Sequence, residues 1–167
     1  MTDAPELGHV TDRLPPFKYS ALTRVWFSDT DAQGVVYYGR YMPYFDLARV
    51  EYHRSLDMLR AEPQEREFVM RAMHVEYHQP ARFDDLIEVD VRISRIGTTS
   101  VTYEFAAYLE GETLAVTASQ TAVLVDLSDR KPSPVPDWWR ERIRAFEGAD
   151  LDNSVQGQVS LPDLSLE

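Results

Sequence analysis

The feature that most constrains this chain is one long helical pattern followed by almost unbroken strand patterns. Apolar residues recur at steps of three or four between Tyr41 and Leu59, which predicts a helix with one broad apolar face. Strands are predicted at 19–28, 69–79, 86–96, 100–109 and 113–126, and a short helix at 137–146. The order β-α-β-β-β-β-α predicts an α+β fold, with an antiparallel sheet wrapped around one long helix.

The alternation within 86–96 predicts how the sheet is buried. Apolar residues from Ile87 to Ile93 alternate with Glu88, Asp90 and Arg92, which indicates one buried face and one wetter face. A sheet that wraps one helix still has a second face and an edge strand that need cover. We therefore expect the chain to form a dimer.

The charge of −11 is concentrated at the two ends of the chain. Residues 1–16 carry a net −2 and residues 147–167 a net −5, which leaves −4 for residues 17–146. We expect a disordered leader over 1–16, a single domain over 17–146 and an acidic disordered tail over 147–167. The acidic balance argues against nucleic acid as a partner, whereas a local basic patch on the domain can still bind an anionic coenzyme.

Several classes of protein are excluded by what the sequence lacks. It has no cysteine, so it can form neither disulfides nor thiolate-bound metal sites, and it has no cysteine nucleophile. No apolar run approaches the roughly 20 residues of a membrane span, and the first twenty residues do not resemble a targeting segment. We expect a soluble, cytoplasmic protein.

Motifs for metal, phosphate or serine-based chemistry are also lacking. His74 and His78 share one face of a predicted strand about 13 Å apart, too far to bind one metal ion together. No glycine-rich phosphate loop and no GxSxG motif occurs. We therefore predict no metal site and no bound cofactor.

The junction between the first strand and the helix is the best place for chemistry. A polar turn containing Asp29, Asp31 and Gly34 leads through an apolar run, 35–38, into the helix. A carboxylate beside the free N–H groups of a helix start can cap the helix. It can instead serve a reaction, in which the N–H groups hold an oxyanion while the carboxylate attacks a carbonyl or activates water. The apolar run indicates that the turn borders a desolvated cleft.

The whole junction resembles a known family. The stretches FSDTDAQGVVYYGRY (27–41) and YFDLARVE (44–51) are similar to the hot-dog-fold acyl-CoA thioesterases of the 4-hydroxybenzoyl-CoA thioesterase type, including their Tol–Pal-associated bacterial branch. A weaker resemblance covers 19–146, where 126–136 looks like the closing strand and loop of the family. The resemblance implies a hot-dog fold and hydrolysis of an acyl- or aroyl-CoA thioester.

The resemblance assigns roles to the residues of the turn. The catalytic carboxylate falls on Asp31, the oxyanion-binding backbone N–H on Tyr38 and the turn-closing glycine on Gly34, while Asp29 shapes the turn. Tyrosine stands at 38 where the bacterial branch commonly has histidine, and Arg40 stands where asparagine is common. These departures concern the identity of the substrate rather than the class of reaction.

Substrate contacts follow from the same resemblance. Arg130 and Lys131, with Arg95 behind them, are expected to bind the phosphates of the coenzyme near a subunit boundary, and Tyr37 and Tyr41 to line the acyl pocket. The family implies a homodimer or homotetramer.

The sequence leaves open the acyl group, whether coenzyme A or a carrier protein bears it, and whether Asp31 acts as nucleophile or base. An alternative function is a non-catalytic module that binds acyl-CoA or an acyl carrier protein. A hydratase of this fold would pair its carboxylate with a nearby histidine, and no histidine lies within twenty residues of Asp31.

Overall fold

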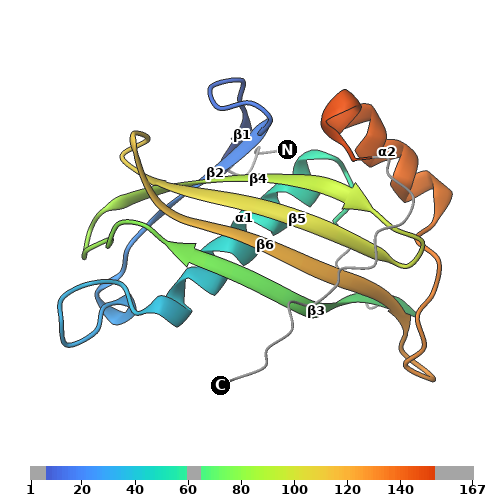
Figure 1. Ribbon diagram of the computed structural model, residues 1–167, viewed down its shortest axis with the longest axis horizontal. Helices are drawn as coiled ribbons and strands as arrows, with labels where there is room; N and C mark the ends of the chain where they lie inside the picture. Colours follow the sequence, from blue (N-terminus) through green and yellow to red (C-terminus); the bar gives the residue numbers. More distant parts are fainter. Residues whose placement is uncertain (1–6, 60–64, 153–167) are drawn as a thin grey trace, which may run out of the picture.

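The sheet and the long helix form the hot-dog arrangement, as the sequence predicts (Figure 1). The computed structural model describes residues 7–59 and 65–152. The strands are β1 (Gly8–Val10), β2 (Tyr19–Arg24), β3 (Arg66–Tyr77), β4 (Leu86–Ile96), β5 (Ser100–Leu109) and β6 (Thr113–Asp126). Within these residues they form one antiparallel sheet in the order β1-β2-β4-β5-β6-β3.

Helix α1 (Tyr41–Ser55) lies across one face of this sheet. Its apolar face is buried over Tyr41, Tyr44, Phe45, Ala48 and Tyr52, but the helix ends at Ser55, before the Leu59 to which the predicted face extends, and Leu59 is exposed. The sheet contributes the inward residues of β4 together with aromatic residues of β5, and the rings of Phe45 and Phe105 lie 4.9 Å apart. Burial of this apolar surface fixes α1 against the sheet and thereby the position where α1 begins.

The outer face of β4 is not as wet as the alternation predicts, because Glu88 and Asp90 are buried. Strand β1 and the loop after it lie in the segment expected to be a disordered leader. β1 pairs with β2, and Arg13 from the loop forms an ion pair of 2.6 Å with Glu88. Ser20 donates a hydrogen bond of 2.8 Å to the same carboxylate. The N-terminal segment therefore covers the acidic side chains that the sequence pattern assigns to solvent.

The domain also extends further towards the C-terminus than expected. Helix α2 (Asp137–Glu147) and the 3-10 turn η3 (Gly148–Asp150) pack against the sheet, and Glu147, placed in the tail by the sequence, is fully buried. Its carboxylate accepts hydrogen bonds from the Tyr52 hydroxyl (2.6 Å) and the Ile93 N–H (3.0 Å). The rest of the expected tail, 153–167, lies outside the described residues.

Strand β3 forms the far edge of the sheet and pairs on one side with β6. An irregularity between Met70 and Ala72 changes the face that its side chains present, so Phe68 packs against the core. The side chain of Met70 is more than half exposed, and that of Tyr77 is half exposed. Among the described residues, no helix is long and apolar enough to cross a membrane.

Candidate functional site

The turn between β2 and α1 holds Asp31 in a closed loop. The Asp31 N–H donates to the Val35 carbonyl (2.9 Å), and the Gly34 N–H donates to the Asp31 carbonyl (3.0 Å). Gly34 has a φ of 76°, and the space around it is open, so its glycine is required by the backbone conformation rather than by crowding. The Asp31 carboxylate accepts the Gln33 N–H at 2.8 Å and stays partly exposed.

Asp29 stabilises the turn through two hydrogen bonds to its carboxylate. Its carboxylate accepts hydrogen bonds from the Trp26 N–H (3.0 Å) and the Tyr44 hydroxyl (2.7 Å). Burial raises the pKa of Tyr44 well above its ordinary value, followed in importance by the hydrogen bond to Asp29, so the hydroxyl remains a donor. The two aspartates therefore differ in their partners: the Asp29 carboxylate is tied to Tyr44 in the first turn of α1, and the Asp31 carboxylate accepts the N–H of Gln33 within its own turn.

The start of the helix leaves backbone donors free next to this turn. The 3-10 turn η2 (Tyr38–Arg40) runs directly into α1, and its Arg40 N–H donates to the Tyr37 carbonyl (2.7 Å). Within the described residues, no hydrogen bond is made by the N–H of Tyr38 or of Gly39. Such N–H groups carry partial positive charge and suit an oxygen that develops negative charge.

Aromatic side chains surround the junction. Tyr37 and Tyr38 are 44% and 62% exposed, and their ring centroids lie 4.2 Å apart. Tyr41, expected to line an acyl pocket, is buried in the core between the rings of Tyr44 and Tyr77. Within one chain Tyr37 and Tyr38 therefore contribute exposed aromatic surface at the turn, and Tyr41 does not.

The expected coenzyme ligands Arg130 and Lys131 lie in the turn that follows β6. Arg130 has a positive φ of 59°, and its N–H donates to the Asp126 carbonyl at 2.9 Å. The Lys131 ammonium lies 3.1 Å from the Asp129 carboxylate, and its side chain is 78% exposed. This exposed ion pair is weak, so Lys131 can exchange its partner for a phosphate.

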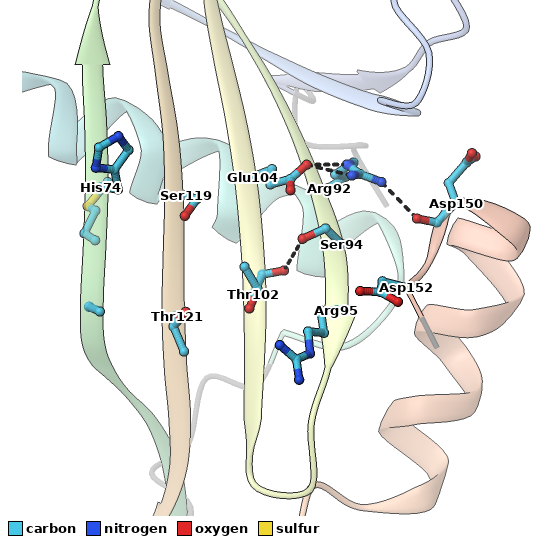
Figure 2. A pocket seen from close by; sticks show the side chains of 12 residues that line it. His74, Arg92, Ser94, Arg95, Thr102, Glu104, Ser119, Thr121, Asp150 and Asp152 are labelled. Carbon is cyan, nitrogen blue, oxygen red and sulfur yellow. Dashed lines mark hydrogen bonds and ion pairs between the residues drawn. The ribbon is translucent and has the colours of Figure 1, made fainter. Parts of the chain in front are cut away.

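Arg95 lies in a groove of about 530 Å³ on the outer face of the sheet (Figure 2). Hydroxyl groups of Ser94, Thr102, Ser119 and Thr121 form its floor. Arg92 closes one side through an ion pair with Glu104, in which Nη2 and Nε both contact Oε2, at 2.7 and 2.8 Å. The groove contains no residue of the Asp31 turn.

The turn after β6, which carries Arg130 and Lys131, and the Arg95 end of β4 lie at one end of the sheet, and the segment between β2 and α1, which carries Asp31, lies at the other (Figure 1). β3 shows the separation, because it begins at Arg66 opposite Asp126 and ends at Tyr77, which contacts Tyr38. Eleven residue steps of strand correspond to about 35 Å. A single copy of the chain therefore does not combine Asp31 with Arg130 and Lys131 in one site.

The predicted absence of a metal site concerns the two histidines of the β3 region. His74 lies 3.4 Å from the Glu76 carboxylate, and His78 lies 3.0 Å from the Thr117 hydroxyl. Over residues 7–59 and 65–152, no group of three or more metal-binding side chains converges.

Two contacts at the site are not predicted from the sequence. Tyr44 lies in the predicted helix and in the motif 44–51, but neither pattern indicates that its hydroxyl fixes Asp29. Tyr77 lies 39 residues after Tyr38, and its hydroxyl reaches the Tyr38 carbonyl at 3.0 Å. Neither spacing is a local pattern, so only the fold reveals these contacts.

Comparisons with known proteins agree on one family. The model of the thioesterase-like superfamily matches residues 25–143. The acyl-CoA thioester hydrolase YbgC of Escherichia coli is 38% identical over 117 residues, which cover 68% of this chain and 86% of that protein. The acyl-CoA thioesterase YbgC of Haemophilus influenzae is 32% identical, over 71% of this chain and 88% of that protein. A solved structure of a probable thioesterase from Bartonella henselae has a TM-score of 0.63 and 32% identity, and covers 71% of this chain and 97% of that one.

Proposed function

This chain belongs to the thioesterase-like superfamily, and from that membership we propose that it hydrolyses acyl-CoA thioesters at the Asp31 turn, using the Asp31 carboxylate and the Tyr38 N–H. The proposal rests on one observation, the arrangement of the Asp31 turn and the start of helix α1. A partly exposed carboxylate in a closed turn lies next to a helix start whose first N–H groups make no hydrogen bond within the described residues. The relatives named as acyl-CoA thioester hydrolases support this class of substrate.

The chemistry follows from charge development in the reaction. As an oxygen nucleophile adds to the thioester carbon, the carbonyl oxygen becomes an oxyanion, which the Tyr38 N–H at the helix start stabilises. Asp31 either attacks the carbon or takes a proton from the attacking water. The C–S bond then breaks and the coenzyme leaves as a thiol after protonation. If water attacked, the free acid forms directly. If Asp31 attacked, water then hydrolyses the mixed anhydride between the acyl group and Asp31, which releases the acid and restores the carboxylate.

We propose a dimer built on the open edge of β3 as the unit that binds the coenzyme. If two β3 strands pair antiparallel, the Arg66 end of one strand lies beside the Tyr77 end of the other. Arg130 and Lys131 of one copy then approach the Asp31 turn of the second, which supplies the cations that one copy lacks there. The exposure of Met70 and Tyr77 on β3 supports this pairing.

A panel of acyl-CoA substrates tests the function. Free thiol release is measured for aromatic, short-chain and long-chain acyl groups. We expect turnover well above the spontaneous rate for at least one class. Binding of every acyl-CoA without thiol release would overturn the proposal and identify a binding module.

The coenzyme site is tested by comparing an acyl-CoA substrate with the same acyl group carried on pantetheine, which lacks the nucleotide of coenzyme A. We expect the double substitution Arg130→Ala and Lys131→Ala to raise KM for acyl-CoA several-fold and to leave KM for acyl-pantetheine unchanged. The substitution Arg82→Ala, on an exposed loop, serves as a control for lost positive charge. Equal KM values for wild type and the double variant with acyl-CoA would contradict the assignment of these two cations.

A further inference from the structure

Tyr77 joins the end of β3 to the start of the helix. Its hydroxyl donates a hydrogen bond of 3.0 Å to the Tyr38 carbonyl, and its ring lies edge-on to the buried ring of Tyr41, with centroids 5.7 Å apart. Burial and the nearby Tyr38 raise the pKa of Tyr77, so the hydroxyl stays protonated at neutral pH. The contact therefore links the sheet to the backbone between Tyr38 and Gly39.

The accepting carbonyl belongs to the same peptide unit as the Gly39 N–H. A peptide unit is planar and trans, so its carbonyl and N–H point in opposite directions, and fixing one fixes the other. A hydrogen bond to the carbonyl also polarises the unit and makes its N–H a stronger donor. The preceding peptide unit, which carries the Tyr38 N–H, is held in the same way by the Arg40 N–H.

Gly39 lies close to the ring of Tyr37. A Cβ atom at this position would lie 3.2 Å from Cε1 of Tyr37, so the glycine allows that ring to pack against the turn. The N–H groups of Tyr38 and Gly39 are therefore neighbouring donors at the start of the helix. In each of their two peptide units, the carbonyl oxygen accepts a hydrogen bond. Neither N–H makes a hydrogen bond within the described residues.

We propose that Tyr77 is a positioning residue that orients the Gly39 N–H as a second donor to the thioester oxygen, beside the Tyr38 N–H. This inference rests on the proposed function. Tyr77 itself touches no reacting atom and acts through the Tyr38–Gly39 peptide unit. Its contribution is greatest when the carbonyl oxygen carries negative charge, so it stabilises the transition state more than the bound substrate.

The substitution Tyr77→Phe removes the hydroxyl and keeps the ring against Tyr41. We expect kcat to fall about 5- to 50-fold, less than the loss of a whole oxyanion donor, while KM changes less than twofold. The melting temperature should stay close to wild type, because Tyr77 is half exposed. Tyr108→Phe is the matched control: it deletes a hydroxyl from β5, at a residue that pairs with Glu88 of β4, and should leave kcat unchanged.

A spectroscopic measurement separates positioning from a structural role. In the Asp31→Asn background, the infrared band of a ¹³C-labelled thioester carbonyl reports the hydrogen bonds to its oxygen. We expect Tyr77→Phe to move this band to higher wavenumber, and Tyr108→Phe to leave it in place. An unchanged kcat or an unmoved band in Tyr77→Phe would overturn the role of Tyr77 alone. Absence of acyl-CoA hydrolysis by the wild-type protein would instead overturn the proposed function.

Discussion

At the scale of single residues, the closed turn depends on Gly34 because of its backbone conformation. The positive φ of 76° allows the Gly34 N–H to reach the Asp31 carbonyl, while the Asp31 side chain is held by the Gln33 N–H. A side chain at 34 would meet no neighbour within 4 Å. Any loss caused by a substitution there therefore arises from strain in the backbone and not from a steric clash.

Substitution of Gly34 should follow the preference of each residue for the left-handed conformation. We expect Gly34→Ala to lower the free energy of unfolding by about 1 kcal/mol and to reduce kcat, because the turn no longer holds Asp31 in place. Gly34→Asn should lose less of both, since asparagine tolerates this conformation better. Thermal unfolding and steady-state kinetics of the two variants check the order, and equal losses would argue against a conformational role.

At the scale of the elements, the sequence predicts strand and helix positions well because their patterns are local. The predicted segments 86–96, 100–109 and 113–126 match β4, β5 and β6, and the helix pattern from Tyr41 matches α1. The contacts that close the sheet are not local. β1 has three residues and gains its stability from pairing with β2, so no periodicity marks it.

The burial of Glu88 and Asp90 also depends on contacts between residues that are distant in the sequence. Alternation along β4 distinguishes its two faces but does not report that Arg13 and the N-terminal loop cover the second one. Neither Asp90 carboxylate oxygen has a hydrogen-bond partner among the described residues. Burial, and secondarily the Glu88 carboxylate, raises the pKa of Asp90 to about 7, an effect that Arg13 partly offsets.

The raised pKa of Asp90 predicts how the stability of the protein depends on pH. Because the native pKa of Asp90 lies above its unfolded value of 3.8, the native state binds more protons between pH 4 and 7. The contribution of Asp90 to stability is therefore complete below pH 4 and is lost as the pH rises through 7. We expect Asp90→Asn to raise the free energy of unfolding at pH 8 by about 1–3 kcal/mol and to change it little at pH 5. Urea titrations at both pH values test this, and an equal effect at pH 5 and pH 8 would contradict it.

At the scale of the whole molecule, the sequence locates the proposed catalytic turn but not the complete proposed site. Asp31, Gly34 and Tyr38 are within eight residues of one another, so a local motif contains them. Arg130 and Lys131 are found at the opposite end of the sheet from Asp31, a separation that follows from the strand register. Whether one copy or two build the site is decided by assembly, and no local pattern encodes it.

The proposed dimer makes a prediction about the open edge. Sedimentation velocity of the wild-type protein should show a species of twice the 19.2 kDa chain mass at micromolar concentration. We expect Met70→Lys, in the exposed edge of β3, to weaken association at least tenfold, since a charge there opposes strand pairing. Leu22→Lys, on β2 near the other edge of the sheet, is the control and should leave association unchanged. A monomeric wild type would contradict pairing through β3.

The most direct measurement of the central claim is thiol release by Asp31→Asn with the best substrate of the wild-type protein. We expect kcat to fall at least 1,000-fold, because the amide neither attacks the thioester nor accepts a proton from water, with substrate affinity retained. Asp57→Asn, the same change at an exposed aspartate after the far end of α1, should keep full activity. Turnover by Asp31→Asn at the wild-type rate would show that Asp31 is not the catalytic carboxylate.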